Sequence, residues 1–300
     1  MNRIFQRPII LALFAMIVAG ASGAALPAKA ETLAQALEKY NISTRQRMLS
    51  QRMAGLSCLV HLDIEAEIHA SEALEARDVF SKSLDILRDG DPDLGTSREN
   101  APRVLVAIDH ARDQHIIMAS HLAALEEVGT VDTTQLSAIA LTSNELFEVS
   151  NTLASQVQLA QSQNLQSLTL LQTMILNFSG RQRMLSEKAF KEFCLAQAGV
   201  DVEANLVDLA KTSVIFDNTM NALINGMPGL IIEPPTQEIK AKLIEARNVW
   251  LPVKDVLERA VAGEVFNTHD IHVATEDLET VRILMDEAVE LYEEYNNSQS

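Results

Sequence analysis

The hexapeptide RQRMLS occurs twice in this chain of 300 residues, first at residues 45–50 and again 136 positions later at residues 181–186. The same offset aligns further identical residues without a gap, among them the pairs Asn41 and Asn177, Ser43 and Ser179, Cys58 and Cys194, Phe80 and Phe216, and Gly90 and Gly226. A constant offset over so long a stretch indicates one structural unit used twice.

Each unit is predicted to consist of helices. The chain has only 11 glycines and 8 prolines, which lie mostly at expected breaks, and the remainder has helical periodicity, so the class is all-α. We expect helices near residues 33–61, 64–88, 102–127 and from about 133 in the first half, and near 202–225, 237–261 and 270–295 in the second half. With the helix that carries the second hexapeptide, each half has four helices, enough for an antiparallel four-helix bundle with its own core.

The connection between the halves looks helical as well. Residues 135–198 contain no proline and one glycine, Gly180. This predicts a shared helix of about 60 residues and about 95 Å, at a rise of about 1.5 Å per residue. The sequence therefore predicts two tandem bundles, residues 31–165 and 166–300, stacked end to end, with Arg47 and Arg183 about 50 Å apart.

One face of the hexapeptide helix is small and semi-polar and carries a single arginine. On a helix this face holds Arg47, Ser50, Ala54 and Cys58, and in the second unit Arg183, Ser186, Phe190 and Cys194. Small side chains let another helix approach closely, and a guanidinium offers a planar fork of donors that suits a small oxyanion.

The run STRQRMLSQRMA at residues 43–54 resembles the hallmark of the PilJ-type domain. This is the N-terminal sensor domain of type IV pilus methyl-accepting chemotaxis transducers, and it is related to the periplasmic sensor domain of nitrate/nitrite-responsive histidine kinases. The later pattern F-x3-L-x2-L-x2-G at residues 80–90 also fits, whereas the second unit departs from the pattern after Ser186.

The resemblance implies a binding site. In the nitrate sensors, an arginine immediately before a methionine binds the anion at a dimer interface, a role that passes here to Arg47 and Arg183. Ser50 and Ser186 would be additional donors, and Arg45 and Arg52 would shape the local field. With the bundles end to end, a shared anion needs a second copy of the chain, so we expect a homodimer. The alternative is that these arginines are solvated or paired with glutamates across the bundle.

Residues 1–30 have the features of a secretory signal peptide, with Arg3 and Arg7 before an apolar run and Ala28-Lys29-Ala30 before Glu31. We therefore expect a periplasmic protein with no membrane insertion after cleavage and no transmitter of its own, acting through a membrane receptor or a pilus or chemotaxis component. Without the leader, 21 Lys and Arg face 41 Asp and Glu, a formal charge of −20, which argues against nucleic acid or anionic lipid as a partner.

The two cysteines, Cys58 and Cys194, occupy equivalent positions in a chain expected in an oxidising compartment. A disulfide needs Cα atoms within about 7 Å of each other, and end-to-end bundles would hold these far apart. We expect two buried thiols, with bridges between chains as the lesser alternative.

No catalytic, metal or cofactor motif is recognisable. His269 and His272 flank Asp270, but without a third convergent ligand we interpret them as a solvated helix start. The sequence favours a non-enzymatic sensor of a small oxyanion such as nitrate or nitrite. The alternative is a helical scaffold that binds no ligand and docks on an envelope, pilus or chemoreceptor component.

Overall fold

The computed structural model describes residues 31–166, 168 and 170–298, which form eight α-helices and no β-strand. The helices are α1 (Leu33–His61), α2 (Ala66–Asp89), α3 (Pro102–Glu127), α4 (Thr133–Ala160), α5 (Leu170–Gln197), α6 (Val202–Asn225), α7 (Gln237–Val261) and α8 (Thr268–Ser298). The predicted all-α class is confirmed, and the predicted leader lies outside the described residues. None of the described helices has a stretch long and apolar enough to cross a bilayer.

Local sequence signals explain several helix ends. Thr32 and Asp132 begin α1 and α4 with capping boxes, in which the cap side chain accepts from the backbone N–H of Gln35 or Gln135. Gly90 ends α2 at a φ of 80°, where an added Cβ would lie 2.6 Å from the carbonyl oxygen of Thr96. Gly226 ends α6 at a φ of 75°, so the break is repeated at the equivalent position.

The two repeats have the same internal packing. In the first, α1 contacts α2 and α4, and α3 contacts α4; in the second, α5 contacts α6 and α8, and α7 contacts α8. Phe80 stacks on His115 with ring centroids 5.0 Å apart, and its counterpart Phe216 packs on Trp250 at 4.1 Å. Trp250 therefore takes the place of His115 in the second repeat.

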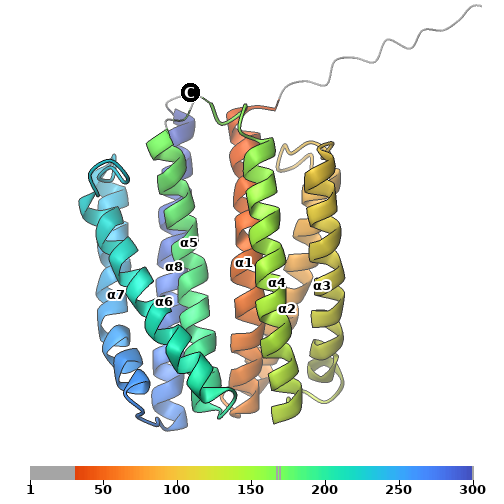
Figure 1. Ribbon diagram of the computed structural model, residues 1–300, viewed down its shortest axis with the longest axis vertical. Helices are drawn as coiled ribbons and strands as arrows, with labels where there is room; N and C mark the ends of the chain where they lie inside the picture. Colours follow the sequence, from red (N-terminus) through yellow and green to blue (C-terminus); the bar gives the residue numbers. More distant parts are fainter. Residues whose placement is uncertain (1–30, 167, 169, 299–300) are drawn as a thin grey trace, which may run out of the picture. The chain divides into compact units, whose positions relative to one another are not determined.

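The predicted end-to-end arrangement is wrong. α4 ends at Ala160, residues 161–166 form turns, and α5 begins at Leu170, so no continuous helix joins the repeats. Instead α1 and α5 pack side by side, as Figure 1 shows. The sequence that connects α4 to α5, beginning QSQNLQ, contains no glycine or proline. The turn nevertheless forms, because it allows α5 to bury its small and apolar face against α1. Tertiary burial of this kind outweighs a weak local helix preference.

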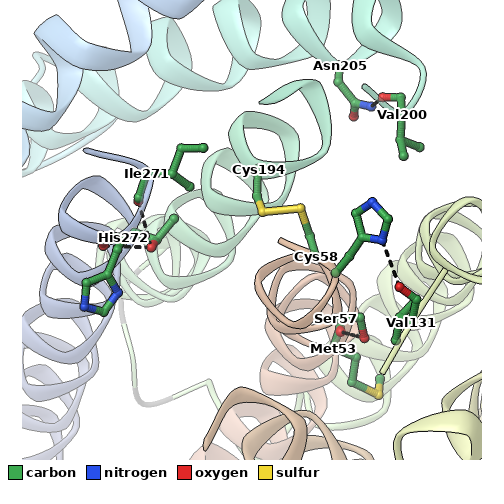
Figure 2. Close-up of a disulfide and its surroundings, with 11 residues drawn as sticks. Met53, Ser57, Cys58, Val131, Cys194, Val200, Asn205, Ile271 and His272 are labelled. Atoms are coloured by element: carbon green, nitrogen blue, oxygen red, sulfur yellow. Dashed lines mark hydrogen bonds between the residues drawn. A yellow bond between two sulfur atoms is a disulfide. The ribbon is translucent and has the colours of Figure 1, made fainter. Parts of the chain in front are cut away.

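The expectation of two free thiols is also wrong. Cys58 of α1 and Cys194 of α5 form a disulfide, with Cα atoms 6.1 Å apart (Figure 2). No cysteine in the described part of the chain is free. The side-by-side packing of α1 and α5 brings the two cysteines within disulfide distance. The predicted separation of about 50 Å between Arg47 and Arg183 is wrong for the same reason.

α1 and α5 approach each other closely near the disulfide. Gly55 of α1 faces the ring of Phe190 of α5, and a Cβ at Gly55 would lie 2.7 Å from that ring. Phe190 itself is 4% exposed. The small residue on one helix therefore makes room for the large residue on the other.

Candidate anion-binding seam between the repeats

A buried polar cluster lies where α1 meets α5, and we call it the seam. It contains Tyr40, Asn41, Thr44 and Arg47 from α1, and Asn177, Gly180 and Arg183 from α5. Asn177 donates from its side-chain nitrogen to the hydroxyl oxygen of Tyr40 at 2.8 Å, so the two repeats contact each other directly here. The two hexapeptide arginines thus lie close enough to interact within one chain, contrary to the expectation that about 50 Å separates them.

Arg183 is fully engaged by protein groups. Its Nη1 donates to Oδ1 of Asp286 on α8 at 2.5 Å. Its Nη2 donates to Oδ1 of Asn41 at 2.8 Å and to the hydroxyl of Thr44 at 3.4 Å. With 2% of its surface exposed, this guanidinium has a carboxylate from its own repeat and two acceptors from the other.

Arg47 has no such partners. Its Nε donates to the backbone carbonyl of Thr44 at 3.4 Å, and its buried Nη2 has no hydrogen-bond partner. Among the described residues, no carboxylate lies within 4.0 Å of this guanidinium, which is 9% exposed. Burial lowers the pKa of Arg47, and the charge of Arg183 lowers it further. Because arginine still keeps its proton, Arg47 is a buried cation with no counter-ion in the described part of the chain.

Sequence differences between the repeats explain this asymmetry. The buried residues of α4 and α8 align at an offset of 135, as in Leu146 with Val281 and Val157 with Tyr292. At that offset, Asn151 occupies the position of Asp286. The acceptor that Thr44 offers Arg183 is also missing from the second repeat, since its counterpart is Gly180. Arg47 therefore lacks both the carboxylate and the hydroxyl that Arg183 uses.

The two serines predicted as ligand donors already donate their hydroxyl hydrogen bonds within the protein. Ser50 donates to the carbonyl oxygen of Arg47, and Ser186 donates to that of Arg183, both at 2.8 Å. Both side chains are fully buried. Each hydroxyl proton stays within its helix, so the serines hold the arginine-bearing turns and leave the guanidinium groups to face the seam.

Arg52 belongs to an ion cluster at one side of the seam, which we define as Arg52, Glu187, Glu279 and Arg282. Nη1 of Arg52 lies 2.9 Å from Glu187 and also pairs with Glu279, while Arg282 lies 2.7 Å from Glu279 and 3.3 Å from Glu187. Burial raises the pKa of Glu279, but the hydrogen bonds and charges of Arg282 and Arg52 outweigh burial and bring the pKa to about 2. The alternative of pairing with glutamates thus describes Arg52 well.

Arg45 lies between the seam and this cluster. It lines a groove of about 290 Å³ with Arg52, Arg282 and Asp286, and it is partly exposed. Its charge lowers the pKa of Asp286, after the larger effects of burial, which raises that pKa, and of Arg183, which lowers it. Arg45 therefore contributes to the field at the carboxylate that holds Arg183.

Sequence reasoning missed the acidic side of this region. Glu279, Arg282 and Asp286 come from α8, far from either hexapeptide. Their spacing of three and four residues places them on one helical face, which was a readable signal. An end-to-end arrangement places no partner helix opposite that face, so the sequence alone does not reveal its role.

The family comparison agrees with this duplicated architecture. The model of the family described as "Type IV pili methyl-accepting chemotaxis transducer N-term" matches residues 28–140 and 172–275. The chain belongs to the PilJ family. No curated protein and no solved structure gave a match.

The two matched segments correspond to the two repeats, so the PilJ domain is present in tandem copies. Membership makes the chain a sensory or interaction module of the chemotaxis-transducer type. The repeated hexapeptide lies on α1 and on α5, the two helices that form the seam.

Proposed function

We propose that this tandem PilJ protein is a periplasmic sensor that binds one small oxyanion of the nitrate or nitrite class at the seam, through Arg47. The observation that carries the proposal is the buried guanidinium of Arg47, which has an unpartnered Nη2 and no carboxylate partner among the residues that the structure describes.

A buried charge without a counter-ion is costly, by several kcal/mol after relaxation. A monovalent planar oxyanion would supply both the missing charge and the missing acceptors, and its geometry matches the fork of a guanidinium. The structure therefore favours an anion over a neutral ligand at this position.

The asymmetry of the seam fixes the expected stoichiometry. Arg183 is already neutralised by Asp286, so a second anion would have to displace a carboxylate 2.5 Å away. We accordingly expect one anion per chain, held between the repeats and not between two chains.

The disulfide and the family support the proposed location and mode of action. Disulfides persist in oxidising compartments, which agrees with the secretory leader predicted from residues 1–30. In the periplasm, an anion at the seam would change how α1 and α5 pack, and a membrane receptor or a pilus or chemotaxis component would recognise that change.

Isothermal titration calorimetry and thermal unfolding with sodium nitrate, nitrite and chloride test the proposal. We expect saturable binding of nitrate or nitrite by the natural chain, with one site per chain. Arg47→Ala should abolish it, and Asn151→Asp should weaken it at least tenfold by placing a carboxylate where Asp286 holds Arg183. Arg98→Ala, which removes a guanidinium from a side chain that is 75% exposed, is the matched control and should bind normally.

Two results would overturn the proposal. One is the absence of binding by the natural chain to any of these anions, which would favour the scaffold. The other is binding that persists unchanged in Arg47→Ala and Asn151→Asp, which would place the anion elsewhere.

A further inference from the structure

A second site lies in a groove between the repeats, at the end of α1 that carries the disulfide. The groove has a volume of about 450 Å³. Leu59 of α1 and Phe190 of α5 contribute apolar walls, while α2 and α8 contribute polar side chains from opposite repeats.

Three of these side chains converge. Glu65 and His69 at the start of α2 and His272 near the start of α8 each offer one ligand atom, and these atoms lie within 4.8 Å of one another. The side chains of His69 and His272 are 13% and 23% exposed, so the histidines are largely enclosed while Glu65 faces solvent.

Each histidine uses one ring nitrogen and leaves the other unpartnered. Nδ1 of His69 faces the carboxylate of Glu72 at 3.3 Å, and Nε2 of His272 faces that of Glu276 at 3.6 Å. The other nitrogens, Nε2 of His69 and Nδ1 of His272, are buried and have no hydrogen-bond partner. A carboxylate on one nitrogen and a free lone pair on the other is the arrangement that orients histidine for a metal ion.

We propose that Glu65, His69 and His272 form a binding site for a divalent transition-metal ion of the zinc class. Two imidazoles and one carboxylate suit Zn²⁺ and leave a fourth position for water, whereas Ca²⁺ and Mg²⁺ prefer oxygen ligands alone. Glu72, Glu276 and Glu279 also line the groove and make its field favourable to a cation.

The equivalent positions at the start of α6 and on α4 carry other residues, which separates this feature from the duplicated fold. Glu65 and His69 correspond to Asp201 and Asn205, and His272 corresponds to Ser137. Asn205 donates to the carbonyl oxygen of Val200 at 2.8 Å (Figure 2), so this side chain is used for local structure. Both Glu65 and Asp201 have a φ of 41°, which shows that the loop conformation belongs to the repeat and that the ligand set is specific to one groove.

The ligands come from both repeats, so the metal would fasten α2 to α8 across the groove. His272 finds its partners on α2 and not in its sequence neighbour His269, which is exposed. The interpretation of a solvated helix start rested on sequence neighbours alone, whereas Glu65 and His69 lie about 200 residues away in sequence and close to His272 in space.

Calorimetric titration of the metal-free oxidised protein with ZnCl₂, and absorption spectroscopy with Co²⁺, test the inference. We expect one Zn²⁺ per chain and a rise in the melting temperature. His69→Ala and His272→Ala should each weaken binding at least tenfold, and Glu65→Gln should weaken it less. His269→Ala on the same helix should bind as the natural chain does. Because both cysteines are bridged, the Co²⁺ spectrum should lack thiolate charge-transfer bands.

Circular dichroism shows whether each variant is folded, and Co²⁺ spectra of the natural chain report the ligand type even if one variant is not. The inference is overturned if the natural chain binds no Zn²⁺ at tens of micromolar. It is also overturned if His69→Ala and His272→Ala bind normally, or if His269→Ala loses binding to the same extent.

Discussion

Cys58 is bonded to Cys194, and the two residues hold the same position in the two repeats. Their Cα atoms lie 6.1 Å apart, so the two repeats face each other through equivalent helices, α1 and α5. The duplication has therefore produced a pair of domains that pack as two subunits of a symmetric dimer would.

Loss of the disulfide should weaken the fold markedly. It closes a loop of 136 residues, for which chain entropy implies a stabilisation of about 5 kcal/mol. We expect Cys58→Ser, Cys194→Ser and the double variant to lower the free energy of unfolding by similar amounts in guanidinium titrations. Additive losses in the double variant would contradict a shared bond, and the reduced natural chain provides the control.

Replacing Asp286, the carboxylate partner of Arg183, should make the surroundings of Arg183 more like those of Arg47. Asp286→Asn gives the second repeat the residue that Asn151 supplies in the first, and leaves a 2% exposed guanidinium without its carboxylate. We expect a loss of about 2 kcal/mol in stability, since Asp286 is partly exposed. Calorimetry should then show nitrate binding to two sites per chain, and an unchanged stoichiometry would argue against guanidinium compensation as the basis of binding.

The two helical glycines at the α1–α5 contact should respond to alanine in opposite directions. Gly55→Ala places a Cβ 2.7 Å from the ring of Phe190, so overpacking should outweigh the better helix propensity and destabilise by about 1–2 kcal/mol. At Gly180 the nearest atom, Nη2 of Arg183, would lie 3.5 Å from the Cβ, which is an ordinary contact. Gly180→Ala should therefore stabilise by about 0.5–1 kcal/mol. Thermal melts of both variants measure the two signs, and equal effects would contradict the close approach at Gly55.

Glu293 should make the protein less stable as pH rises. Burial raises its pKa from 4.5 to about 7, with Arg183 and Arg45 opposing the shift and Glu38 adding to it. A raised carboxyl pKa means that the folded state binds more protons than the unfolded state between about pH 4.5 and pH 7. Stability from this group is therefore full below pH 4.5 and lost as pH rises through 7, by up to about 3 kcal/mol.

The matched variant is Glu293→Gln, which keeps an oxygen to accept from Asn41. We expect it to be more stable than the natural chain at pH 8 and nearly equal at pH 4.5. Urea titrations across this range measure the difference, and two parallel pH profiles would show that Glu293 is not the titrating group.

The sequence predicted the helices and the duplication well because both depend on local information. Capping residues such as Thr32 and breakers such as Gly90 act within one turn, and the ungapped repeat placed Arg47 and Arg183 in equivalent positions. The arrangement of the repeats depends on residues 161–166, where no single residue type marks the turn. That turn forms because α5 gains more by packing on α1 than by continuing α4.

The site was predictable only in part for a related reason. The hexapeptide identifies the two arginines, but the difference in their carboxylate partner comes from α4 and α8, where the offset between repeats changes from 136 to 135. An ungapped comparison pairs Asp286 with Ser150, and only the buried positions of the helices show that Asn151 is its true counterpart. The convergence of His69 with His272 likewise requires the fold, because the two come from opposite repeats.

Because one polypeptide carries both halves of the seam, the two halves can acquire substitutions independently. In a homodimer every substitution appears on both sides of the axis, so one half cannot change alone. Here Asn151 and Asp286 are encoded separately, and mutation has been free to give one half a fixed counter-charge and leave the other half open. The covalent link also keeps the halves together at any dilution, so the response to a ligand would not depend on how much of the protein the cell makes.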